Sequence, residues 1–93
     1  AEAPRPTARR DADVALALAR AGRWREAVPL FRAAVAKSPT SAALVTDLGY
    51  ALGRVGQRAE AERMFRHAIE LDPARPYAYQ NLAELLTTDP ARF

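Results

Sequence analysis

The sequence predicts an all-α fold built from about two and a half repeats of a helix–turn–helix unit. Three observations support this prediction. The 93-residue chain repeats itself with a period of 34 residues. Apolar residues within each half of the unit recur at i, i+3, i+4 and i+7, the spacing of one helical face. Glycine and proline fall where such helices should end.

The repeat emerges when residues 8–41 are aligned with residues 42–75. Twelve of the 34 aligned positions are identical, whereas chance would give about a tenth for a chain this rich in alanine and arginine. The identical pairs are Ala8/Ala42, Asp13/Asp47, Ala17/Ala51, Leu18/Leu52, Arg20/Arg54, Gly22/Gly56, Glu26/Glu60, Ala27/Ala61, Phe31/Phe65, Arg32/Arg66, Ala34/Ala68 and Pro39/Pro73. Glycine, acidic and aromatic positions all recur, so the period reflects a repeated structural unit.

The first helix of the first unit lies in the segment DADVALALARAG. Its predicted apolar face carries Val14, Ala15, Leu18 and Ala21. Gly22 follows directly, at the position where a left-handed residue commonly caps a helix. The equivalent residue of the second unit is Gly56, which predicts the same turn there.

The second helix of the first unit lies in WREAVPLFRAAVAKSP. Its predicted apolar stripe is Ala27, Leu30, Phe31, Ala34 and Val35. Pro39 ends this helix, and Ser38 or Thr40 is placed to cap the next one. Pro29 lies inside the helix near its start, where it removes one backbone hydrogen bond, so we expect a mild kink and no break.

The third unit begins with PYAYQNLAELLT, a first helix expected from Pro76 to about Thr88. Its apolar residues are Tyr79, Leu82, Ala83, Leu85 and Leu86. A partner second helix would cover part of this stripe. The remaining sequence, TTDPARF, reads as a cut or capping end, so we expect the bare stripe to promote self-association of the chain through this helix.

These features resemble the tetratricopeptide repeat family. The second unit matches the family pattern best, through Leu48, Gly49, Gly56, Ala61, Phe65, Ala68 and Pro73. The first unit departs from it at Ala15 and Leu18, where glycine and an aromatic residue are usual. The resemblance implies residues 1–7 as a disordered or linker N-terminus, units at 8–41 and 42–75, and a partial third unit at 76–93. It also implies an α-α superhelix whose first helices line a concave face.

The composition gives no support to an enzyme. The chain has no cysteine and a single histidine, His67, on the expected outer face of a second helix. Metal sites need three or four ligands, and the four glycines are too scattered to form a phosphate-binding loop. No apolar stretch approaches the roughly 18 residues of a membrane span. We therefore expect no catalysis, no cofactor, no metal and no membrane span.

The family resemblance implies that a protein or peptide partner binds to the concave face. The candidate residues there are Arg9, Asp13, Leu16, Arg20, Thr46, Asp47, Tyr50, Arg54, Tyr77, Gln80, Asn81 and Glu84. Asp13, Asp47 and Asn81 are equivalent, as are Arg20 and Arg54. These rows read either as polar contacts between units, the interpretation we favour, or as a peptide groove with paired guanidinium groups.

Members of the family that hold acidic chaperone tails use a clamp of basic residues and Asn on this face. The matching positions here carry Ala12, Leu16, Tyr50, Tyr77 and Asn81, so we predict no chaperone-tail clamp. Trp24 reads as packing beneath the helix–helix turn, with an exposed partner anchor as the alternative.

The sequence leaves two alternative functions open. The segment could be a structural spacer in a longer protein, such as one of a bacterial envelope. Nucleic-acid binding ranks low, because the net charge is only +3 and carboxylates interleave with the arginines. Alanine- and arginine-rich, lysine-poor usage is typical of high-GC bacterial genomes. The sequence leaves open the bacterial cytoplasm and the periplasm or envelope, and AEAPRP reads equally as a mature terminus or as an arbitrary boundary.

Overall fold

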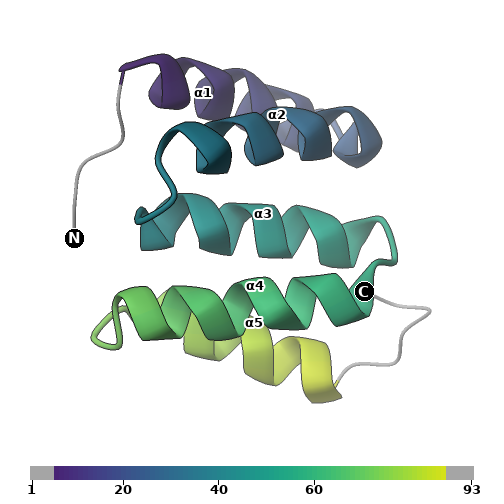
Figure 1. Ribbon diagram of the computed structural model, residues 1–93. Helices are drawn as coiled ribbons and strands as arrows, with labels where there is room; N and C mark the ends of the chain where they lie inside the picture. The colour runs from purple at the N-terminus through teal and green to yellow at the C-terminus, as the bar shows by residue number, and fades with distance from the viewer. Residues whose placement is uncertain (1–5, 88–93) are drawn as a thin grey trace.

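The computed structural model describes residues 6–87, which form five α-helices and no strand (Figure 1). The helices are α1 (Pro6–Arg20), α2 (Trp24–Lys37), α3 (Ala42–Arg54), α4 (Arg58–Leu71) and α5 (Pro76–Thr87). The all-α prediction is confirmed. Expectations for residues 1–5 and 88–93 lie outside the described residues.

The helices pack in order along the chain. α1 packs on α2 and α3 packs on α4, while α2–α3 and α4–α5 contacts join one pair to the next. Figure 1 shows α3 in the middle of this stack, between the α1–α2 pair and the layer of α4 and α5. None of the helices within residues 6–87 is both long enough and apolar enough to cross a membrane.

Both predicted glycine turns are confirmed. Gly22 and Gly56 have φ of 79° and 90°, a region that residues with a Cβ rarely adopt. The next residue closes each turn: the Arg23 N–H donates to the Leu18 carbonyl and the Gln57 N–H to the Leu52 carbonyl, both at 2.9 Å. This bond pattern is the Schellman motif, in which glycine ends the helix and reverses the chain.

The other helix boundaries correct the expectations in detail. α1 begins at Pro6, so Pro6 and Thr7, expected in the linker, are helical; proline suits the first turn because its missing N–H has no partner there anyway. Ser41, and neither Ser38 nor Thr40, caps α3, since its Oγ accepts the Leu44 N–H at 3.4 Å. α2 runs without a break through Pro29, as expected.

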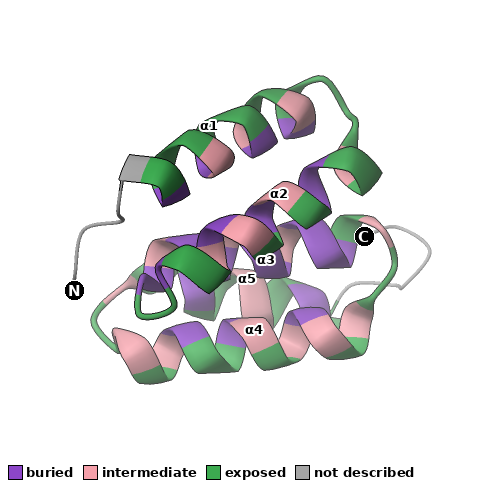
Figure 2. Cartoon of the chain, turned by 45° about the horizontal axis from the view of Figure 1, so that its top comes forward, coloured by how far each residue is buried: buried purple, intermediate pink, exposed green. Residues whose placement is uncertain are grey.

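The buried face of α1 differs from the predicted one. Val14 is 48% exposed and Ala21 is exposed, whereas the buried residues of this helix are Ala8, Ala12, Ala15 and Ala19. α1 lies at the end of the stack, so its outer side has no neighbouring helix among the described residues (Figure 2). Alanines three or four positions apart allow close approach to α2, and this contact determines which face of α1 is buried.

The core is centred on α3 and α4. Phe31 and Phe65 are the largest fully buried side chains, and Phe65 has no exposed surface. Phe65 belongs to one cluster with Leu48 and Leu52 of α3 and Leu85 of α5. Phe65 therefore lies between the second unit and the first helix of the third.

Gly49 on α3 makes room for the Phe65 ring. A Cβ at Gly49 would lie 2.8 Å from Phe65 Cε1 and 2.9 Å from Cδ1, closer than carbon atoms tolerate. We expect Gly49→Ala to destabilise the protein by about 1 kcal/mol, because overpacking costs about 1–3 kcal/mol and the gain in helix propensity returns up to about 1 kcal/mol. Urea unfolding measures the change. In a Phe65→Leu background the penalty should shrink; an equal penalty in both backgrounds would mean that the ring is not the obstacle.

α5 presents an apolar stripe to solvent. Tyr79 is 46% and Leu86 is 52% exposed, and Ala83 between them is exposed. The opposite side of the helix, with Ala78 and Leu85, is buried against the stack. Ala83, expected among the apolar residues of this helix, therefore has no helix packed against it among the described residues.

We expect this stripe to drive weak self-association of the chain. Sedimentation over a wide concentration range should show a rising average mass, and Leu86→Glu should abolish the rise because it places a charge in the contact. Val14→Glu, which changes an exposed apolar residue at the other end of the stack, is the matched control. A monomer at every concentration would refute the expectation.

Candidate functional site

An open pocket of about 660 Å³ lies on the face formed by α1, α3 and α5. Residues of all three helices line it, together with two from α2 and one from the loop between α4 and α5. The lining residues are Leu16, Ala19, Trp24, Phe31, Ala43, Thr46, Asp47, Tyr50, Arg75, Tyr77, Asn81 and Glu84. We call this space the groove pocket.

The structure brings together seven of the candidate residues in the groove pocket. They are Leu16, Thr46, Asp47, Tyr50, Tyr77, Asn81 and Glu84. Arg9, Asp13, Arg20 and Gln80 are exposed and do not line it. Arg54 lines a neighbouring hollow of about 390 Å³ with Gly22, Arg23 and Glu26.

The favoured interpretation of the polar rows, contacts between units, finds no support in the row of Asp13, Asp47 and Asn81, although Arg54 lies over the Trp24 ring of the preceding unit. Among residues 6–87 no hydrogen bond or ion pair joins Asp13, Asp47 and Asn81 to one another. Long-range ion pairs instead join helices elsewhere: Arg32 to Glu60, at 2.5 and 2.9 Å, and Lys37 to Asp11, at 2.6 Å. Asp47 and Asn81 face the pocket because α3 and α5 line it, whereas Asp13 points away from it with the outer side of α1.

Five pocket residues were not among the candidates: the small residues Ala19 and Ala43, and three larger ones. Trp24 and Phe31 reach the groove pocket from α2, and Arg75 reaches it from the loop before α5. Arg75 occupies the position equivalent to Ser41, the N-cap residue of α3. The sequence offered one signal for Arg75: it stands at a repeat position where a helix-capping residue is expected.

Aromatic rings form one side of the groove pocket. The Trp24 and Tyr50 ring centroids lie 5.4 Å apart at an interplanar angle of 59°, and Trp24 also packs against the core. The Arg54 guanidinium carbon lies 5.4 Å from the Trp24 ring centroid. Trp24 therefore packs against the core, as expected, and its ring also lines the groove pocket, while a role as partner anchor stays a prediction. Tyr77, 64% exposed on α5, presents a further ring.

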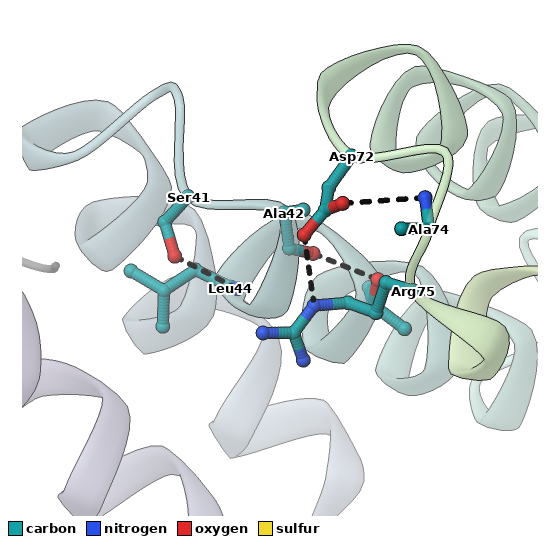
Figure 3. Close-up of polar contacts among 7 residues, drawn as sticks. Ser41, Ala42, Leu44, Asp72, Ala74 and Arg75 are labelled. Atoms are coloured by element: carbon teal, nitrogen blue, oxygen red, sulfur yellow. Dashed lines mark hydrogen bonds and ion pairs between the residues drawn. The ribbon is translucent and has the colours of Figure 1, made fainter. Parts of the chain in front are cut away.

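Arg75 and its neighbours dominate the electrostatics. The Arg75 Nε lies 3.9 Å from Asp72 Oδ2, and Asp72 Oδ1 accepts the Ala74 N–H at 3.3 Å (Figure 3). Burial raises the pKa of Asp47 to about 6, and the attraction of Arg75 opposes this rise only in part. For the ionised Asp47 side chain, the free-energy cost of burial is therefore larger than the stabilisation from Arg75.

The Thr46 hydroxyl is already engaged within α3. It donates to the Ala42 carbonyl at 2.7 Å, and Thr46 is buried. Within residues 6–87 no group of three or more His, Cys, Asp or Glu is arranged to hold a metal ion. Asp47, Asn81 and Glu84 also line the pocket, and within residues 6–87 their side chains form no hydrogen bond.

Comparison with solved structures reveals a similar fold. The second TPR domain of Spaghetti (RPAP3), solved with the HSP90 peptide SRMEEVD, superposes with a TM-score of 0.83 and 21% sequence identity. The likeness covers 88% of this chain and 76% of that one. No curated protein matches the chain by sequence.

The family follows from the sequence match and the architecture together. The model of the tetratricopeptide repeat family matches residues 18–80, which extend from the last three residues of α1 through the first turn of α5. Within that range, paired helices, the two left-handed glycines and the buried aromatic residues recur in the order of the repeat. The chain belongs to the tetratricopeptide repeat family.

Proposed function

We propose that this chain is a protein-interaction module that binds an extended peptide segment of a partner in the groove pocket. The observation that carries the proposal is the pocket itself, which is open and lined by residues of α1, α3 and α5. Trp24, Tyr50 and Tyr77 supply the large, stiff side chains that often dominate binding energy at protein interfaces. Membership of a family of interaction modules supports the same role, and no catalytic arrangement in the pocket argues for another.

The similar RPAP3 domain was solved with an acidic peptide, but the groove pocket argues against the same ligand here. Asp47 and Glu84 line it, and Arg75 is its one cationic residue. An acidic tail would meet two like charges. The expectation that this chain has no clamp for chaperone tails stays a prediction, and titration with the peptide SRMEEVD tests it directly.

Selection from a display library of random decapeptides tests the proposed function. Tyr77→Ala should weaken the selected peptides about tenfold or more, as expected for truncation of an exposed aromatic anchor. Tyr79→Ala is the matched control, because Tyr79 lies two residues away on α5 and is exposed outside the pocket. We expect this control to change the affinity less than about twofold.

Two results would overturn the proposal. The first is a library from which no peptide is enriched, which would favour the structural-spacer interpretation. The second is a set of enriched peptides that bind equally well to wild type and Tyr77→Ala, which would place the binding surface elsewhere. Circular dichroism of both tyrosine variants ensures that a lost interaction does not reflect a lost fold.

A further inference from the structure

The groove pocket carries more negative than positive charge. Asp47 enters it from α3, Glu84 from α5 and Arg75 from the loop between α4 and α5. The residues that line it from α1 and α2 are Leu16, Ala19, Trp24 and Phe31, none of which is charged. The lining therefore contains two carboxylates and one guanidinium among mostly apolar residues, and burial leaves the charge of Asp47 less screened than that of the exposed Glu84.

The charge of Arg75 is already engaged by the protein. Its Nε is buried, has no hydrogen-bond acceptor within residues 6–87, and lies 3.9 Å from Asp72 Oδ2. Its charge also attracts Asp47. Because Arg75 interacts with both Asp72 and Asp47, little of its positive charge is left to attract an anionic ligand.

The two carboxylates of the pocket lack a hydrogen-bonding partner within residues 6–87. In the described part of the chain, neither Asp47 nor Glu84 accepts a hydrogen bond or forms an ion pair through its carboxylate. Burial of the Asp47 carboxylate without a donor accounts for its pKa of about 6. A cationic donor supplied by a ligand would satisfy both groups.

The aromatic lining suits the same kind of ligand. Trp24, Tyr50 and Tyr77 present ring surface to the pocket, and the faces of such rings attract cations. The protein itself provides the example, since the Arg54 guanidinium lies over the Trp24 ring on the side of the neighbouring hollow. The alkyl stem of a long basic side chain would cover the apolar part of the lining.

From these contacts we propose that the groove pocket binds the side chain of an arginine or lysine in the partner peptide, with its charge between Asp47 and Glu84 and its stem against Tyr50 and Tyr77. The inference rests on the proposed peptide-binding function and specifies the residue that anchors the peptide. In this proposal Asp47 and Glu84 bind the charged group, and the rings of Tyr50 and Tyr77 contact the alkyl stem.

The peptides enriched from the random decapeptide library provide the first test. Arginine or lysine should recur at one position, and citrulline there, which keeps the shape of arginine but has no charge, should weaken binding about tenfold or more. In Asp47→Asn/Glu84→Gln the arginine and citrulline peptides should bind within about threefold of each other. Asp13→Asn, an acidic residue at the equivalent repeat position but outside the pocket, should leave the tenfold difference unchanged.

The pH dependence of binding provides a second readout, measured with a blocked peptide that has no Asp, Glu or His. Below pH about 6 protons compete with the cationic side chain for Asp47, so the affinity should fall up to about tenfold between pH 7.5 and 5.0. Asp47→Asn should remove this fall, and Glu84→Gln should retain it. His67→Gln, which removes the only imidazole from the exposed side of α4, should retain it as well.

These experiments distinguish failure of the cationic anchor from failure of the proposed peptide-binding function. Enriched peptides that depend on Tyr77 but carry acidic or apolar residues at the anchor position would overturn the cationic anchor and leave the proposed function standing. Equal affinity of the arginine and citrulline peptides for wild type would do the same. A library without any enriched peptide would overturn both.

Discussion

Phe65→Ala should lower the free energy of unfolding by about 3–5 kcal/mol, the cost typical of truncating a buried aromatic residue. Phe65 has no exposed surface and packs among Leu48, Leu52 and Leu85. Its loss leaves a cavity where α3, α4 and α5 meet. For a 93-residue chain, a total stability of about 0.05–0.15 kcal/mol per residue means that this change removes a large share of the stability.

Thermal and urea melts followed by circular dichroism measure the effect. Val14→Ala, a truncation of an apolar residue that is 48% exposed, is the control and should change the stability by less than about 0.5 kcal/mol. A melting temperature only about a degree or two lower for Phe65→Ala would mean that the helices are packed in a different register.

Asp47→Asn should stabilise the protein at neutral pH. Burial raises the pKa of Asp47 to about 6 from its usual value of 3.8, so above pH 6 the folded state contains an ionised carboxylate that the unfolded state solvates better. The difference of roughly two pKa units corresponds to about 3 kcal/mol of lost stability at pH 7.5. Asparagine keeps the shape of the side chain and removes the charge, so we expect a gain of about 1–3 kcal/mol.

The sign of the pH effect follows from the direction of the shift. Between pH 3.8 and 6 the folded state binds more protons at this site than the unfolded state. The free energy of unfolding of the wild type therefore rises as the pH falls through this range. The advantage of Asp47→Asn should therefore shrink between pH 7.5 and 4.5, as urea denaturation at the two values measures. Asp13→Asn, at the equivalent position on exposed α1, should change the stability by less than about 0.5 kcal/mol at either pH.

Destabilisation by Asp47→Asn at pH 7.5 would contradict this account. It would mean that the attraction between Asp47 and Arg75 outweighs the cost of burying the carboxylate. In that case the groove pocket would hold a satisfied ion pair, and the argument for a cationic ligand would lose its main support.

Sequence periodicity predicted those features that depend on local chemistry repeated in both units. Gly22 and Gly56 end helices because the left-handed turn is closed by bonds within a few residues. The buried position of Phe65 could be predicted because its neighbours, Gly49 and Leu52, belong to the same unit. The glycine turns and the contact of Gly49 with Phe65 lie within one unit, so they need little knowledge of how one unit packs on the next.

The remaining features depend on position in the stack. Equivalence within the repeat placed Asp13 beside Asp47, but α1 has one covered side and turns its alanines toward α2, which leaves Asp13 and Val14 exposed. Arg75 could not be placed because a long side chain on a loop has no periodic pattern to follow. For the candidate site, the helix faces were predictable and the contributions of α2 and the loop were not.

The central place of α3 determines how the molecule would open. Nine of its residues are buried, whereas α1 and α5 each leave one side to solvent. Local unfolding starts where the fewest buried contacts must be broken, so amide hydrogens should exchange fastest in the two outer helices and slowest in α3. The wall that carries Asp47 and Tyr50 would then stay fixed while the walls that carry Leu16 and Tyr77 fluctuate. Ligand binding should therefore slow amide hydrogen exchange mainly in α1 and α5, the two outer helices, and much less in α3.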